Sequence, residues 1–102
     1  MTDSPSEAQV ALFRAGQRMG WHVHSLYLLA LSYVRANGLE SSWKRDLATL
    51  VLLEKSEGRD PNWPTPEKTE LLCCFIENRG QPKVFQVYLD HIANEWERQW
   101  IA

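Results

Sequence analysis

The feature that most constrains the fold is an apolar block, Leu26 to Val34, in which only Ser32 is polar. A helix that packs on one side needs about three apolar positions in seven, so this block has apolar side chains on more than one face. The block is far shorter than the roughly 20 residues that span a bilayer, so we expect no membrane span. It must be buried either at the centre of a small bundle or against another chain, and the sequence leaves both open.

The block lies inside a stretch with clear helix start and stop signals. Ser4-Pro5-Ser6-Glu7 has the serine, proline and acid order of a helix start, and Asn37-Gly38 is typical of a helix end. These signals predict one long helix, or two end to end, over residues 5–37. Gly16 and Gly20 each cost up to about 1 kcal/mol in a helix interior, and they predict a kink or a close helix contact rather than a full break.

Three further helices are predicted in the rest of the chain. Ser41 or Ser42 caps the first, which ends before Gly58; the second covers residues 66–78, and Pro82 opens the last. Apolar residues at helical spacing predict their core faces. These faces are Trp43, Leu47, Leu50 and Val51; Leu71, Leu72, Phe75 and Ile76; and Val84, Tyr88, Ile92, Trp96 and Trp100. The fold class is therefore expected to be all-α, a compact bundle of four to five helices.

Length and charge restrict the classes of protein further. The 102 residues fit a single helical domain over 1–102, and 44% hydrophobic with 24% charged residues is ordinary for a folded domain. The formal net charge is -2 and no basic block is present, which argues against direct binding to nucleic acid. The first residues, MTDSPSEAQ, lack the basic and apolar regions of a secretory signal, so we expect a cytoplasmic protein.

The histidines do not form a ligand pattern. His22 and His24 are two residues apart, which places them about 200° apart around a helix, so they cannot share one metal ion. The plainer interpretation is that one borders the core and the other meets solvent. His91 and Glu95 are four apart on the last helix, and we interpret them as a surface pair.

The two cysteines are adjacent, which rules out a disulfide between them in ordinary geometry. Glu70 and Glu77 flank Cys73 on the helix and would raise its pKa, so a nucleophilic role is not expected. Cys74 is interpreted as a small buried residue. We therefore expect no enzyme activity, no cofactor and no metal site.

Tryptophan and leucine are abundant, and some of these side chains are expected to bind another chain. The five tryptophans must partly be core, but Trp63 lies between two prolines in a loop, where it is either a binding anchor or a lid over the helix ends. The residues predicted to form a partner or dimer interface are Trp21, Tyr27, Leu28, Leu31, Trp63, Trp96 and Trp100.

The segments FRAGQRMGWHVHSLYLLALSYVRANG and NEWERQWIA, with the slight acidity and the helical signals, resemble the small bacterial quorum-sensing anti-activators. The resemblance covers the whole chain in outline and transfers no residue roles. It implies a homodimeric helical protein that binds the ligand-binding domain of a LuxR-type transcription regulator and blocks its dimerisation and DNA binding. The alternative interpretation is a phage-type inhibitor or adaptor that binds another host protein complex. A small enzyme or metal protein would have to bring His22, His24 or His91 together with Cys73.

Overall fold

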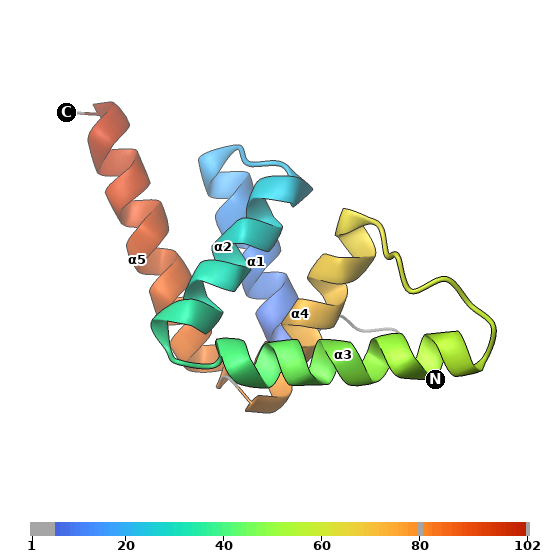
Figure 1. Ribbon diagram of the computed structural model, residues 1–102. Coiled ribbons are helices and arrows are strands. Elements are labelled where there is room, and N and C mark those ends of the chain that lie inside the picture. Colours follow the sequence, from blue (N-terminus) through green and yellow to red (C-terminus); the bar gives the residue numbers. More distant parts are fainter. Residues whose placement is uncertain (1–5, 80, 102) are drawn as a thin grey trace.

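The computed structural model describes residues 6–79 and 81–101, the last two of them without their side chains. Its five helices are shown in Figure 1, and the described residues contain no strand. The predicted all-α bundle is therefore confirmed. The helices are α1 (Glu7–Met19), α2 (Val23–Ala36), α3 (Glu40–Ser56), α4 (Thr65–Arg79) and α5 (Pro82–Ile101). None of them is long and apolar enough to cross a membrane, within the part of the chain that the structure describes.

The start of α1 is fixed by two side-chain caps. Ser6, in an extended conformation, accepts a hydrogen bond from the backbone N–H of Gln9 at 3.2 Å. The Glu77 carboxylate on α4 accepts one from the backbone N–H of Ala8 at 3.0 Å. Two of the unpaired N–H groups of the first turn are thus satisfied, one locally and one by a distant helix. The predicted cap residues Ser4 and Pro5 lie outside the described residues.

The predicted stretch over 5–37 forms two helices, which is one of the two alternatives, and the break at Gly20 is complete where a kink was favoured. Gly20 adopts a left-handed conformation, with φ 69° and ψ 29°, and its N–H bonds the carbonyl of Gly16. This is the usual way in which glycine ends a helix, and α2 begins after the extended residue His22. The predicted close helix contact is present, because a Cβ placed on Gly16 would lie 2.7 Å from a terminal methyl of Leu26.

The link from α2 to α3 also relies on a left-handed glycine. Gly38 has φ 69°, and the N–H of the next residue, Leu39, bonds the carbonyl of Val34 at 2.9 Å. Leu39 is the N-cap of α3 and packs on the core, without a side-chain cap bond. The prediction that Ser41 or Ser42 caps this helix was wrong, because the turn and the burial of Leu39 set the start.

The core is formed chiefly where α1 lies along α5 and where α2 lies along α4. At its centre the Tyr33 ring meets Phe85 edge-on at 4.8 Å between centroids and Tyr88 at 5.4 Å. The predicted face of α5 was wrong by one residue: Phe85, Leu89 and Ala93 are buried, whereas Val84 is exposed and Tyr88, Ile92 and Trp96 are half-buried. Phe85 is buried because its ring contacts the Tyr33 ring of α2. This contact, together with the packing of α5 along α1, sets which face of α5 is buried.

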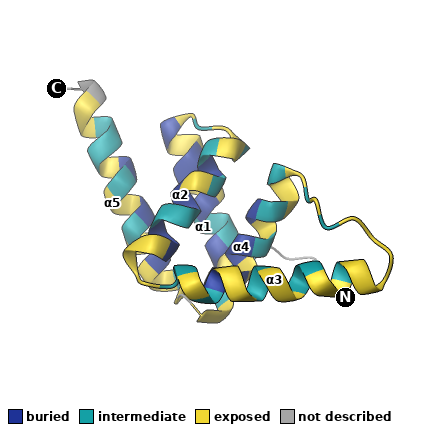
Figure 2. Cartoon of the chain, viewed as in Figure 1, coloured by how far each residue is buried: buried dark blue, intermediate teal, exposed yellow. Residues whose placement is uncertain are grey.

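Helix α3 differs from the other helices in how little of it is covered (Figure 2). Trp43, near the start of α3, is the one buried residue of this helix, and its ring centroid lies 5.4 Å from that of Phe75. Leu47, Leu50 and Val51 of the predicted core face are only half-buried. The C-terminal end of α3 extends past the other helices before an eight-residue loop, 57–64, returns to α4 (Figure 1).

Candidate functional site

Two of the predicted interface tryptophans form a pair. Trp21, in the turn between α1 and α2, meets Trp96 of α5 edge-to-face, with ring centroids 5.3 Å apart and planes at 86°. Both rings are half-buried and pack on the edge of the core. Such a geometry holds both rings in place and leaves part of each available to solvent. The side chain of Trp100, another predicted interface residue, lies outside the described residues.

Trp21 of this pair also lines a groove between α2 and α5. The groove has a volume of about 390 Å³ and is lined by Trp21, Ser25, Leu28, Leu29, Ser32 and Ile92. The Ser32 and Tyr88 hydroxyls are 2.7 Å apart and join the two helices beside the groove. Leu28 stands on its rim with 52% of its surface exposed. The arrangement provides apolar walls, two hydroxyl groups and one exposed apolar side chain.

The opposite flank of α2 is covered by the chain itself. Tyr27 and Leu31 are half-buried and pack on the core, and Val34 is fully buried. The Lys68 ammonium of α4 lies 5.8 Å from the centre of the Tyr27 ring. Most apolar side chains of the Leu26–Val34 block are therefore covered because α2 lies at the centre of the bundle. Leu28 is the large apolar side chain of the block that stays exposed.

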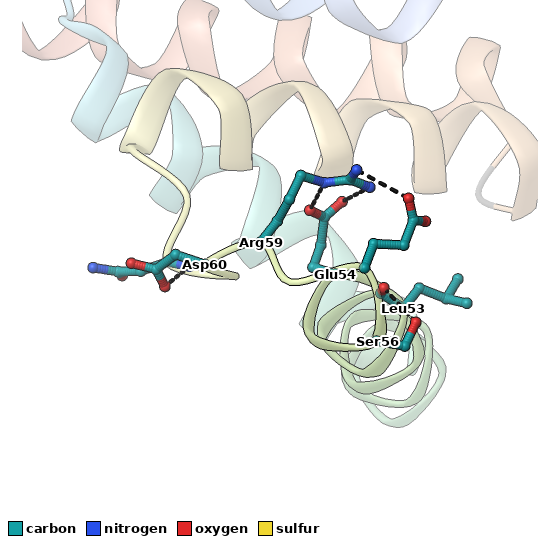
Figure 3. Close-up of polar contacts among 7 residues, drawn as sticks. Leu53, Glu54, Ser56, Arg59 and Asp60 are labelled. Carbon is teal, nitrogen blue, oxygen red and sulfur yellow. Dashed lines mark hydrogen bonds and ion pairs between the residues drawn. The ribbon is translucent and has the colours of Figure 1, made fainter.

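Trp63 is placed apart from the other predicted interface residues. It is half-buried in the 57–64 loop and lies outside the core cluster of the described residues. The loop is ordered by polar contacts at the end of α3 (Figure 3): Arg59 binds the carboxylates of Glu54 at 2.6 Å and Glu57 at 2.9 Å, and Asp60 accepts the N–H of Asn62. The structure thus brings Trp21 and Leu28 to one groove, with Trp96 packed against Trp21, and leaves Trp63 on a separate surface.

Sequence reasoning missed a second groove, between α3 and α4. Its volume is about 370 Å³, and its lining residues are Trp43, Asp46, Thr49, Leu50, Leu71, Cys74, Phe75 and Asn78. On the same helix, Leu52 and Leu53 are 69% and 53% exposed. A signal for this surface was present in the sequence, because Leu52 and Leu53 lie off the core face of their helix.

The exposure of the histidines and of Cys74 contradicts two predictions. His22 and His24 are both exposed, so the expectation that one borders the core was wrong. Cys74 was predicted to be buried but is exposed, whereas Cys73 is buried. Burial raises the pKa of the Cys73 thiol to about 12, and the charges of Cys74, Glu70 and Glu77 add to the rise. No three His, Cys, Asp or Glu side chains of the described residues are grouped so that they could hold a metal ion.

Comparisons with protein-family models, with curated proteins and with solved structures found no match to this chain. The α2–α5 and α3–α4 grooves are therefore the features from which a function can be inferred.

Proposed function

We propose that the protein is a non-enzymatic cytoplasmic inhibitor, an anti-activator that binds the ligand-binding domain of a LuxR-type transcription regulator. Binding would block the dimerisation of that regulator and so its attachment to DNA. The observation that supports this proposal is the α2–α5 groove, which is lined by Trp21, held in place by Trp96, and has Leu28 exposed on its rim.

The groove has the properties of a site that receives side chains from a partner helix. Its aromatic end is fixed by the edge-to-face contact, so binding does not have to order a mobile ring. Each leucine or phenylalanine side chain that a partner buries contributes about 1.5–3 kcal/mol, so two or three anchors would supply a substantial part of the binding free energy. A partner that docks an amphipathic helix by its apolar face would match such walls.

The charge of the chain favours a protein target over DNA. With a net charge of -2, the molecule lacks the general attraction to phosphates on which DNA binding depends. An inhibitor of this kind acts by removing the active dimer of the regulator from solution. Its effect on DNA binding is then indirect.

The test is a titration of purified ligand-binding domains, from the LuxR-type regulators of the same cell, with the wild-type protein and with Leu28→Glu. A carboxylate buried without a partner is costly, so we expect Leu28→Glu to weaken binding at least about 100-fold. The matched control is Val87→Glu, which places the same charge at a 68% exposed apolar position of α5. It should bind like the wild type, and circular dichroism should show equal helicity for all three proteins.

The effect on DNA provides the second measurement. The wild-type protein should abolish the gel shift of the regulator without shifting the DNA itself, and Leu28→Glu should not. A direct shift of DNA by the protein would contradict the proposal. If no LuxR-type domain binds but a different host complex is retained through Leu28, the groove is an interaction site and the regulator is the wrong partner.

A further inference from the structure

The α3–α4 groove has largely apolar walls. Leu50 of α3 lines one side, and Leu71 and Phe75 of α4 line the other. Leu50 and Leu71 are both half-buried, so part of each side chain is open to solvent. Leu53 follows Leu50 by three residues and lies one turn further along the same side of α3, with 53% of its surface exposed. The apolar surface therefore extends from the groove along α3, which gives it the elongated form that a helix-binding groove requires.

Two carboxylates of α4 border this groove. Glu67 precedes Leu71 by four residues and Glu70 precedes Cys74 by four, and both Leu71 and Cys74 line the groove. Glu67 and Glu70 are exposed, and neither forms an ion pair within the part of the chain that the structure describes. The other acids of α3, α4 and the loop between them are each bound by an arginine or by a backbone N–H, namely Glu40, Asp46, Glu54, Glu57, Asp60 and Glu77.

The cations of the same elements lie away from the groove or are already paired. Within the described residues, those that form no ion pair are Lys44, Arg45, Lys55 and Lys68. The Lys68 ammonium lies 5.8 Å from the centre of the Tyr27 ring, on the flank of α4 that meets α2. Around the axis of α3, Lys44 and Lys55 are turned by about 150–170° from the side that lines the groove, and Arg45 by about 110°. The unpaired charge that borders the groove is therefore negative.

We propose that the α3–α4 groove binds a basic amphipathic helix of a second protein. The apolar side chains of that helix occupy the groove, and its lysine or arginine side chains pair with Glu67 and Glu70. Apolar walls with unpaired carboxylates beside them are complementary to such a helix in both shape and charge. The inference does not depend on the regulator assignment, because that assignment uses the α2–α5 groove. The protein would then hold two partners on separate surfaces.

Calorimetric titration of the full chain with a synthetic helix tests this proposal. The probe is a peptide of about 18 residues, or five turns, with leucines at helical spacing on one face and lysines on both flanks of that face. It should bind saturably at micromolar concentrations. One control peptide has glutamate in place of each lysine, and a second has the composition of the probe without an apolar face. Both controls should bind at least about 10-fold more weakly. No saturable binding of the probe, or equal binding of the glutamate peptide, would overturn the proposal.

Neutralising the two carboxylates tests whether they select the cations of the probe. The double variant Glu67→Gln, Glu70→Gln should bind the lysine peptide about 3- to 30-fold more weakly at low salt, and its binding should depend less on the sodium chloride concentration. The matched control is Asp90→Asn with Glu95→Gln, which removes the same charge from exposed or half-buried positions of α5. This control should bind like the wild type, and circular dichroism should show equal helicity for all three proteins. An unchanged affinity after loss of Glu67 and Glu70 would contradict the proposed contact.

The thiol of Cys74 reports where the peptide binds. Cys74 is exposed and lines the groove, whereas Cys73 is buried with its pKa raised to about 12, so a thiol reagent near neutral pH modifies Cys74. Saturating lysine peptide should slow this labelling several-fold, with Cys74→Ser as the blank. Leu28→Glu should show the same protection, because its change lies in the α2–α5 groove. A bound peptide that leaves the labelling rate unchanged, or protection that is lost in Leu28→Glu, would place the site elsewhere and overturn the proposal.

Discussion

The adjacent cysteines show how strongly one residue of offset changes the chemistry of a side chain. Successive residues of a helix are turned by about 100°, so burial of Cys73 leaves Cys74 on the outside of α4. The sequence correctly indicated that Glu70 and Glu77 would raise the pKa of Cys73, but the largest cause is burial. Packing decides which of the two neighbouring cysteines faces inward. Their helix propensities are the same and cannot distinguish them.

The raised pKa of Cys73 predicts a loss of stability at high pH. In the unfolded chain this thiol ionises near pH 9, whereas in the folded protein its pKa is about 12. Between these values the folded state keeps a proton that the unfolded state has lost, so the free energy of unfolding should fall by up to about 1.4 kcal/mol per pH unit. The raised pKa of Tyr33, caused by burial, acts in the same direction above pH 10.

Urea denaturation of the wild type, Cys73→Ala and Cys74→Ser, from about pH 8 to about pH 11, measures this loss. The slope above pH 9 should be shallower in Cys73→Ala, where the buried thiol is absent, and unchanged in Cys74→Ser. An equal slope in Cys73→Ala would show that another group is responsible.

The crossing of α1 and α2 is set by Gly16, whose missing side chain admits Leu26. We expect Gly16→Ala to cost about 1–3 kcal/mol through overpacking, partly offset by about 1 kcal/mol of better helix propensity. Leu26→Ala removes the obstacle at a cost of its own. In that background the same Gly16→Ala change should become neutral or stabilising. Thermal or urea unfolding of the wild type, the two single variants and the double variant measures the coupling. If the two changes in the free energy of unfolding are additive, a side chain at position 16 does not compete with Leu26 for space.

Helix bounds were predictable where local signals act alone and failed where tertiary contacts compete. The starts of α4 at Thr65 and of α5 at Pro82 follow from proline and acid positions. The break at Gly20 was missed because a left-handed glycine and an ordinary helical glycine look alike in sequence. Of the candidate site, Trp21, Leu28 and Trp96 were identified, but their convergence across α2 and α5 depends on the packing of helices distant in the chain.

The whole molecule is longer than a compact domain of its size. Its principal extents are 53 × 26 × 24 Å and its radius of gyration is 14.6 Å, against about 13 Å for a typical domain of this length. We expect small-angle scattering of the monomer, measured at low protein concentration, to give a radius of gyration near 15 Å and an elongated profile. A value near 13 Å would mean that α3 folds back on the bundle in solution.

The pairing of α1 with α5 has a consequence for biosynthesis. Arg18 on α1 binds Glu97 at 2.8 Å and Asn94 at 2.8 Å, so a contact that secures the first helix needs residues near the other end of the chain. At 5–20 residues per second, the ribosome takes roughly 3–13 s to synthesise the segment between the end of α1 and the start of α5. For that time Leu12 and Ala15, which are buried in the final fold, have only α2 and then α4 to cover them. The pairing that completes the core thus makes the nascent chain dependent on its own middle helices, or on a chaperone, until α5 has emerged.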